Sequence, residues 1–241
     1  MSKPSRILVF QHIAAEHPGI FRNYFNEDGI EWCPIELDEG EFIPSLDEFD
    51  ALWVMGGPMD VWEEKEYPWL VDEKAAIREA VIERKLPYFG FCLGHQLLAD
   101  ALGGEVGLAK APEIGMLDVD MTASGATSPF LQNIPNKMKC LQWHSAEVKR
   151  APENAKVLVS TQACEIQSMS ILSHALSVQY HIEITPTTVS EWGEIPAYKS
   201  ALEKQLGENA LEKINADANT HINDMNRYSR VLYENWKRST L

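Results

Sequence analysis

Basic residues are scarce in this chain, and long apolar runs are missing. The 241 residues carry 21 Lys and Arg against 36 Asp and Glu, which gives a formal net charge of −15. Nucleic-acid backbones are bound by clustered Lys and Arg, so this charge argues against a nucleic-acid partner and favours solubility. No apolar run approaches the roughly 20 residues that span a bilayer, so no membrane partner is expected.

Cysteine is also sparse, and its spacing excludes further classes of protein. Cys33, Cys92, Cys140 and Cys164 are scattered without paired spacing, which argues against a disulfide framework. Zinc-ligand spacing and a phosphate-binding loop are both missing, so we expect no metal and no cofactor. The first six residues lead into a strand pattern without a signal peptide, and together with the unpaired cysteines this predicts a cytoplasmic protein.

What the chain does contain is a cysteine between two glycines where a strand gives way to a helix. Apolar residues 86–91 end in Gly90-Phe-Cys92-Leu-Gly94, and a helical pattern begins at Leu93. Such flanking glycines permit a tight turn that lifts the side chain clear of the sheet. The helix N-terminus would lower the pKa of the thiol and favour the thiolate. A buried structural cysteine is the alternative, but the turn favours a nucleophile.

A cysteine nucleophile needs an imidazole to carry its proton and an acceptor to orient that imidazole. His181 closes a strand-like run and Glu183 follows two residues later, so both side chains lie on one side of an extended chain. An ordinary surface histidine is the alternative. His95 is too close to Cys92 in sequence to reach back to it, so we expect a residue that packs or that supports the site indirectly. We expect His144 to line the same cleft. The other histidines are expected on the surface: His12, His17, His174 and His221.

Strands and helices alternate in the first ninety residues, which predicts an α/β fold with a mostly parallel sheet flanked by helices. Strand patterns cover Arg6–His12, Glu31–Leu37, Ala51–Met55 and Pro87–Phe91, and helical patterns cover Gly19–Phe25 and Leu70–Arg84. The second helix has an apolar stripe of Val71, Ala75, Ile77, Ala80 and Val81. Ligands of such a sheet bind beyond the carboxyl ends of its strands.

The section from Glu105 to Val178 is expected to form shorter, partly antiparallel strands, one of which carries His144. Its turn signals are Ala111-Pro112 and Asn133-Ile-Pro135. The composition changes after Pro186, so we expect a catalytic domain over 1–186 and a helical extension over 187–241.

The extension carries three helix signals. They are a capping box at Thr188–Glu191, a helix over Pro196–Leu206 that ends at Gly207, and an amphipathic helix over His221–Trp236 with Ile222, Met225, Tyr228 and Leu232 on its apolar side. We expect these helices to pack on the chain's own domain. A docking surface for another protein is the alternative.

Four motifs resemble those of class I, triad-type glutamine amidotransferases, in the family's order and over about residues 5–184. They are Met55-Gly-Gly57-Pro58, Gly90-Phe-Cys92-Leu-Gly94-His-Gln96, Trp143-His144-Ser145 and Gln179-Tyr-His181-Ile-Glu183. The resemblance is to stand-alone chains similar to the amidotransferase domain of GMP synthase. It implies the flavodoxin-like fold of that family with a C-terminal helical extension.

The resemblance also implies a role for each matched residue. Cys92 is the nucleophile, His181 the general base and acid, and Glu183 the residue that orients it. The backbone N–H groups of Gly57 and Leu93 form the oxyanion hole.

The substrate-binding residues are implied in the same way. Gln96 lies near the α-amino and carboxylate end of the substrate, and His144 and Ser145 line the glutamine pocket. The family often has proline where this chain has Ile182, and often has His-Gly-Asp where this chain has His-Ser-Ala146, so the details of substrate binding differ here.

The activity implied is hydrolysis of the γ-amide of glutamine through a γ-glutamyl thioester, with ammonia passed to a synthase partner. A γ-glutamyl peptide or amide hydrolase acting on a small metabolite is an alternative. A non-catalytic regulatory protein on the same fold is a further one, which the Cys-His-Glu set makes the least favoured.

Overall fold

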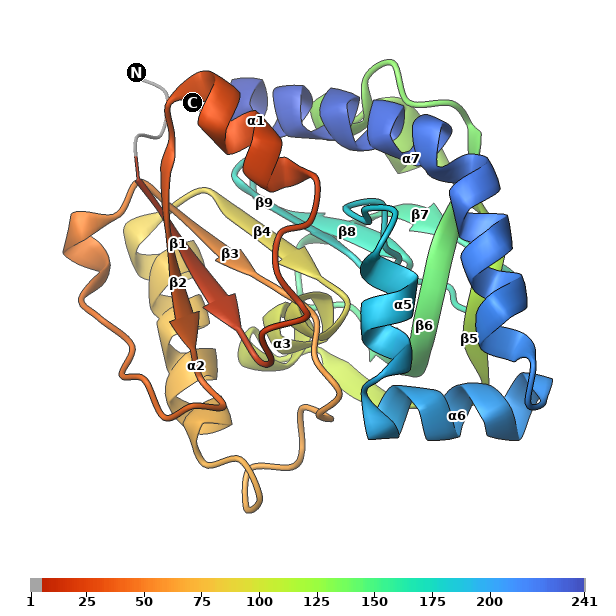
Figure 1. The fold of residues 1–241 in the computed structure, drawn as a ribbon. Helices are drawn as coiled ribbons and strands as arrows, with labels where there is room; N and C mark the ends of the chain where they lie inside the picture. The colour runs from red at the N-terminus through yellow and green to blue at the C-terminus, as the bar shows by residue number, and fades with distance from the viewer. Residues whose placement is uncertain (1–5, 241) are drawn as a thin grey trace.

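The computed structural model describes residues 6–240, which contain one sheet of nine strands covered by helices on both faces (Figure 1). The strand order across the sheet is β2-β1-β3-β4-β9-β8-β7-β5-β6. The strands are β1 Arg6–Gln11, β2 Glu31–Glu36, β3 Ala51–Val54, β4 Tyr88–Phe91, β5 Glu105–Met121, β6 Lys137–Arg150, β7 Ala155–Ser160, β8 Ser168–Ile171 and β9 Ala175–Val178. The helices are α1 Phe21–Asp28, α2 Trp69–Arg78, α3 Leu93–Ala101, α4 Ala123–Ala126, α5 Thr188–Gly193, α6 Pro196–Leu206 and α7 Ala210–Thr240.

The sheet has a parallel half and an antiparallel half. Neighbouring strands from β2 through β1, β3 and β4 to β9 are parallel, and those from β9 through β8, β7 and β5 to β6 are antiparallel. The predicted α/β fold is therefore confirmed, with a sheet that is mixed. Parallel strands put their carboxyl ends at one edge, so β3, β4 and β9 end beside one another.

The middle section differs from the expectation of short strands. β5 has 17 residues and β6 has 14, and the two pair along most of their length. The expected turn at Ala111-Pro112 is wrong: both residues lie inside β5, where the register shifts between Leu108 and Glu113. A bulge of this kind accommodates a proline that cannot donate a ladder hydrogen bond.

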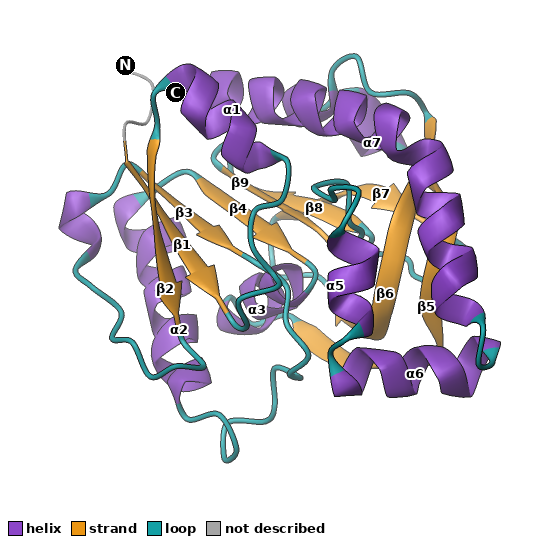
Figure 2. Ribbon diagram, viewed as in Figure 1, coloured by secondary structure: helices purple, strands orange, loops and turns teal. Residues whose placement is uncertain are grey.

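Helices cover each face of the sheet (Figure 2), and an apolar layer lies between the sheet and the helices on each face. One face packs against α1 and α7 through aromatic residues that include Phe21, Trp53 and Trp236. The other face packs against α2 and α3 through residues such as Ile77 and Leu97. The stripe expected on α2 is partly wrong, because Val71 is 51% exposed.

The helices that follow Pro186 lie against the antiparallel half of the sheet and along its aromatic face (Figure 1). α6 begins and ends where the sequence predicts, and Gly207 caps it with a positive φ of 86°. α7 is longer than expected, with 31 residues, and Trp236 at its far end is fully buried and donates to the Tyr88 carbonyl at 3.1 Å. The division of the chain at residue 186 stays a prediction.

Two further expectations concern helices. The capping box is wrong, because the Thr188 hydroxyl accepts from the Thr185 N–H instead of capping the helix. In residues 6–240, every helix is too short or too polar to cross a membrane.

Candidate active site

The Cys92 turn is built as its two glycines predict. Cys92 has φ 48° and ψ −101°, a strained conformation for a residue with a side chain, and its N–H donates to the Val178 carbonyl of β9 at 2.8 Å. A methyl group on Gly94 would lie 2.2 Å from the Val54 carbonyl oxygen, and one on Gly90 would lie 2.7 Å from the Gly94 oxygen. Only glycine permits this close approach of α3, β3 and β4, which holds Cys92 at the first turn of α3.

His181 and Glu183 lie just beyond β9, and the backbone fixes both. His181 exchanges two hydrogen bonds with Leu141 of β6, at 2.8 and 3.2 Å. The Nδ1 atom of His181 lies 2.5 Å from Glu183 Oε1, and the second oxygen of Glu183 accepts from the Ile182 N–H at 2.9 Å. The carboxylate is thus held from two sides and orients the imidazole ring.

Charge and burial act in opposite directions on His181, which is 1% exposed and lies edge-on to the Trp192 ring at 4.6 Å between ring centroids. Burial lowers the pKa of His181, but Glu183 and a hydrogen bond to Cys92 outweigh it and hold the pKa well above its usual value. Gln179 also donates to the Cys92 sulfur, at 3.5 Å. The sulfur therefore faces two hydrogen-bonding side chains.

The backbone of the Gly56-Gly57 loop meets the start of α3 beside Cys92. A methyl group on Gly57 would lie 3.0 Å from Leu93 Cδ2, so the two residues are in close contact. Leu93 is the first residue of α3, and the first N–H groups of a helix have no intrahelical acceptor. The N–H groups of such a loop and helix start can serve an anionic oxygen.

A cavity of about 200 Å³ opens at Cys92. It is small, since drug-sized ligands occupy pockets of about 300–1,000 Å³. Six residues expected at the site line it, whereas His181 and Glu183 lie buried behind the cysteine. The lining residues are Gly57, Pro58, Met59, Asp60, Cys92, Leu93, Gln96, Trp143, His144, Ser145, Ala146, Ala197, Tyr198 and Ala201.

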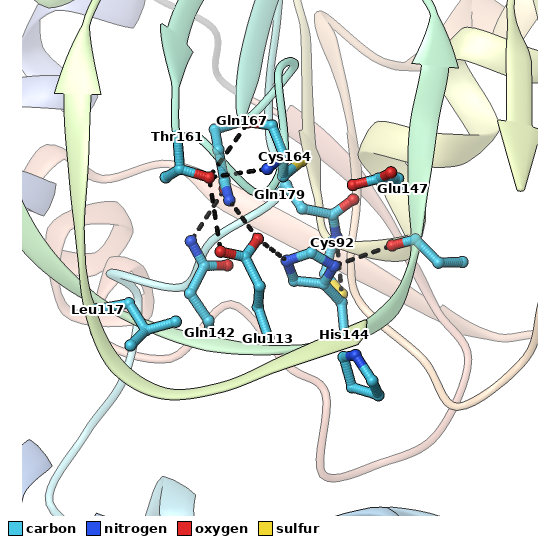
Figure 3. A network of polar contacts seen from close by, with 12 residues as sticks. Cys92, Glu113, Leu117, Gln142, His144, Glu147, Thr161, Cys164, Gln167 and Gln179 are labelled. Carbon is cyan, nitrogen blue, oxygen red and sulfur yellow. Dashed lines mark hydrogen bonds and ion pairs between the residues drawn. The ribbon is translucent and has the colours of Figure 1, made fainter. Parts of the chain in front are cut away.

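His144 lines this cavity, and its ring nitrogens are joined to a buried polar network (Figure 3). Its Nδ1 atom lies 2.9 Å from the Ala146 carbonyl oxygen, and its Nε2 atom lies 3.3 Å from Glu113 Oε2, although without hydrogen-bond geometry. Gln167 donates to the same oxygen of Glu113 at 2.9 Å. The ring nitrogens of His144 are therefore directed to other partners than Cys92.

Gln96 belongs to the next part of this network. Its amide nitrogen donates to the Ala146 carbonyl at 3.0 Å and to Gln179 Oε1 at 3.1 Å. Gln96 thereby links the cavity wall at Ala146 to the residue that donates to the Cys92 sulfur. The roles assigned to Gln96 and Ser145 in substrate binding stay predictions.

Two histidines expected on the surface are buried, so that expectation is wrong for His12 and His174. Both ring nitrogens of His12 face acceptors, the Gly56 carbonyl at 2.8 Å and Glu73 at 2.9 Å. Burial lowers the pKa of His12, but the Glu73 carboxylate raises it above its usual value. His12 therefore anchors the Gly56-Gly57 loop to α2, a role that a lone histidine in the sequence does not signal.

His95 is a packing residue, as expected. Its ring nitrogens lie 2.8 Å from the Ser177 hydroxyl and 3.0 Å from the Ile166 carbonyl oxygen, and burial lowers the pKa of His95 to about 3. Burial also raises the pKa of the Cys140 and Cys164 thiols, which makes them poor nucleophiles. Within residues 6–240, no group of His, Cys, Asp and Glu side chains is arranged to hold a metal ion.

Sequence reasoning missed two residues of the site, Glu16 and Tyr198. Tyr198 lines the cavity from α6, and its hydroxyl donates to the buried Glu16 carboxylate at 2.6 Å. The two residues are 182 positions apart, and neither belongs to a local pattern that would have singled it out.

Comparison with known proteins points to the same family as the sequence motifs. The family profile described as Glutamine amidotransferase class-I matches residues 26–191. A glutamine-hydrolyzing GMP synthase subunit of Sulfolobus acidocaldarius is 31% identical over 160 residues, which are 66% of this chain and 79% of that protein. Gamma-glutamyl peptidase 3 of Arabidopsis thaliana is 25% identical over 170 residues, 68% of this chain and 67% of that protein.

Another relative is much longer. GMP synthase (glutamine-hydrolyzing) of Aeropyrum pernix is 36% identical over 132 residues, and the match spans 55% of this chain but only 24% of that protein. Among solved structures, a glutamine amidotransferase from Thermotoga maritima superimposes with a TM-score of 0.86 at 28% identity, covering 97% of this chain and 98% of its own. The likeness to this structure thus includes the C-terminal helices.

Proposed function

The chain belongs to the class-I glutamine amidotransferase family and is an enzyme of it, and from this premise we propose that it hydrolyses the γ-amide of glutamine through a γ-glutamyl thioester. Cys92 is the nucleophile, His181 the general base and acid, and Glu183 its orienting partner. The observation that carries the proposal is the strained Cys92 turn at the start of α3. The Cys92 sulfur is hydrogen-bonded to the buried His181, and Glu183 holds the His181 ring in place.

In the first step, the Cys92 sulfur attacks the amide carbon and the carbonyl π electrons move to oxygen. The N–H groups of Gly57 and Leu93 stabilise the resulting oxyanion. As the tetrahedral intermediate collapses, the C–N bond breaks and His181 gives its proton to the departing nitrogen, which leaves as ammonia. An amide nitrogen is a poor leaving group, so this step needs an acid, and the raised pKa of His181 keeps that proton available.

In the second step, water attacks the thioester carbon while His181 removes its proton. The same oxyanion site holds the new tetrahedral intermediate. Its collapse breaks the C–S bond, releases glutamate and restores the imidazolium–thiolate pair. A cavity of about 200 Å³ suits a substrate of the size of one amino acid.

A γ-glutamyl amide with a larger amine is the second candidate substrate. One observation favours it: Ser145 and Ala146, which line the cavity, take the place of the Gly-Asp pair common in the family. Relatives named gamma-glutamyl peptidase match this chain over 68% of its length.

One assay decides between these substrates. Purified protein is incubated with glutamine and with a panel of γ-glutamyl amides, and glutamate and free amine are quantified. We expect release from glutamine that Cys92→Ala abolishes and that Cys33→Ala, at a partly exposed cysteine away from the cavity, retains. Release from a γ-glutamyl amide but not from glutamine would favour the second candidate, and release that survives Cys92→Ala would refute both.

The same assay addresses a synthase partner. An amidotransferase subunit that serves a synthase is expected to be a weak glutaminase until the partner docks. Strong basal turnover of the purified chain would support a self-contained hydrolase instead.

A further inference from the structure

α6 forms part of the cavity wall, but its residues lie beyond those that match the family profile. The matched residues end at position 191, whereas α6 begins at Pro196 and lines the cavity with Ala197, Tyr198 and Ala201. The Tyr198 ring lies against Trp192, at 6.0 Å between ring centroids, and Trp192 in turn covers the ring of His181. A helix of the C-terminal region is therefore built into the site.

The Tyr198 hydroxyl meets a second buried carboxylate on the far side of the cavity wall. Glu16, in the connection between β1 and α1, is 2% exposed and accepts the Tyr198 O–H at Oε1, at 2.6 Å. Its other oxygen lies against the Gly56-Gly57 loop, because a methyl group on Gly56 would be 2.5 Å from Glu16 Oε2. The carboxylate is thus enclosed between α6 and the Gly56-Gly57 loop.

Four titratable groups face Glu16: His181, Glu183, His12 and Tyr198. Burial raises the pKa of Glu16, and the charge of His181 and the hydrogen bond from Tyr198 oppose that rise. His12 already has a carboxylate partner on α2 and a carbonyl partner in the loop. The charge of Glu16 therefore acts on both His181 and His12, and at His181 it has the same sign as the charge of Glu183.

We propose that Glu16 and Tyr198 are positioning residues for the hydrolysis: Tyr198 holds the Glu16 carboxylate against the Gly56-Gly57 loop, and Glu16 helps to keep His181 protonated. This inference rests on the proposed roles of Cys92 and His181. A negative charge near the imidazolium stabilises the imidazolium–thiolate pair, and a carboxylate packed on the loop restricts its movement. In this proposal α6 takes part in catalysis through the contact of Tyr198 with Glu16.

The test uses Glu16→Gln, Tyr198→Phe and the double variant in the full chain. Two pH profiles are measured: kcat/KM for glutamine, and the rate at which iodoacetamide alkylates Cys92, followed by peptide mass mapping. In Glu16→Gln we expect the alkaline limb of kcat/KM to move to lower pH by about one unit, because loss of a nearby negative charge lowers the pKa of His181. The inflection of the alkylation profile that reports deprotonation of His181 should move to lower pH in the same way, because loss of a negative charge lowers the pKa of a neighbouring imidazolium.

Tyr198→Phe should shift both profiles in the same directions by less, since it removes only the hydrogen bond that holds Glu16. The double variant should shift no further than Glu16→Gln, because Tyr198 acts through Glu16. Tyr228→Phe on α7 and Glu194→Gln at the end of α5, neither of which lines the cavity, should leave both profiles unchanged. Unfolding temperatures identify any variant that fails to fold. If Glu16→Gln does not fold, the test rests on Tyr198→Phe, which keeps the aromatic ring.

Unmoved profiles in folded Glu16→Gln and Tyr198→Phe would overturn the proposal. So would additive losses in the double variant that appear only in KM, because Tyr198 would then be a cavity wall alone. These outcomes differ from failure of the proposed function, which would show as hydrolysis that survives Cys92→Ala. The alkylation profile tests Glu16 and Tyr198 independently of any substrate.

Discussion

At Gly94, a single added methyl group should impair catalysis while the protein still folds. The added Cβ would lie 2.2 Å from the Val54 carbonyl oxygen and 2.8 Å from the Val54 carbonyl carbon. Both atoms belong to the backbone of β3, so no side-chain rotation relieves the clash. The Gly94 N–H also donates to the Met55 carbonyl at 3.1 Å, so moving the start of α3 away from β3 also stretches this hydrogen bond.

The size of the effect follows from this geometry. Restoring an ordinary contact of 3.4 Å requires α3 and β3 to separate by roughly 1 Å. That movement displaces the Leu93 N–H and the Cys92 sulfur together, and a misplacement of about 1 Å costs about 10²-fold in rate. Overpacking of this kind lowers the free energy of unfolding by about 1–3 kcal/mol, which leaves the protein folded.

The assay compares Gly94→Ala with Gly107→Ala. A methyl group on Gly107 would meet nothing closer than 3.6 Å, so this variant controls for the glycine-to-alanine change itself. We expect Gly94→Ala to lose about 10²-fold in kcat/KM and roughly 2–4 °C in unfolding temperature per kcal/mol lost, and Gly107→Ala to match the wild type. A folded Gly94→Ala with wild-type kcat/KM would refute the steric argument for the turn.

Three further predictions follow from named contacts. A chloro-ketone analogue of glutamine should label Cys92 alone among the four cysteines, as shown by peptide mass mapping, and Cys92→Ala should lower turnover by roughly 10⁴; label on another cysteine would contradict the assignment. Glu183→Gln should move the alkaline decline of kcat/KM to lower pH, since the raised pKa of His181 depends on that charge and the protonated ring is lost as pH rises through a lower pKa; an unchanged pH–rate profile would argue against it. Trp236→Ala should cost about 3–5 kcal/mol in urea unfolding, because the ring is fully buried, whereas Trp62→Ala, at 45% exposure, should cost little; equal costs would show that α7 does not stabilise the sheet.

Much of the parallel half of the fold could be predicted because its signals are local. Residues 7–10 of β1 and the whole of β4 are apolar, as strands buried on both faces require, and all four residues of β4 are buried. The antiparallel half was harder to predict. β5 and β6 carry a bulge at Pro112, and a bulge looks like a turn when the pairing strand is unknown.

The C-terminal region shows a similar limit. The apolar spacing over His221–Trp236 indicates an amphipathic helix, but the helix begins eleven residues earlier, at Ala210. Its first turns have a weaker apolar pattern, and they pack on the residues around Trp192 and Tyr198. Contacts of this kind stabilise helical turns whose own pattern would not predict them.

The turn at Cys92 and the pairing of His181 with Glu183 were determined by the sequence alone, because each depends on residues within a few positions of one another. Two glycines set the sterics of the turn, and a spacing of two along extended chain directs the histidine and the acid to one side. The position of Glu16 and Tyr198 was decided only by the tertiary structure. They meet across 182 residues because α6 packs back over the strand ends, and no local pattern encodes a contact that exists only when those two distant segments are packed together.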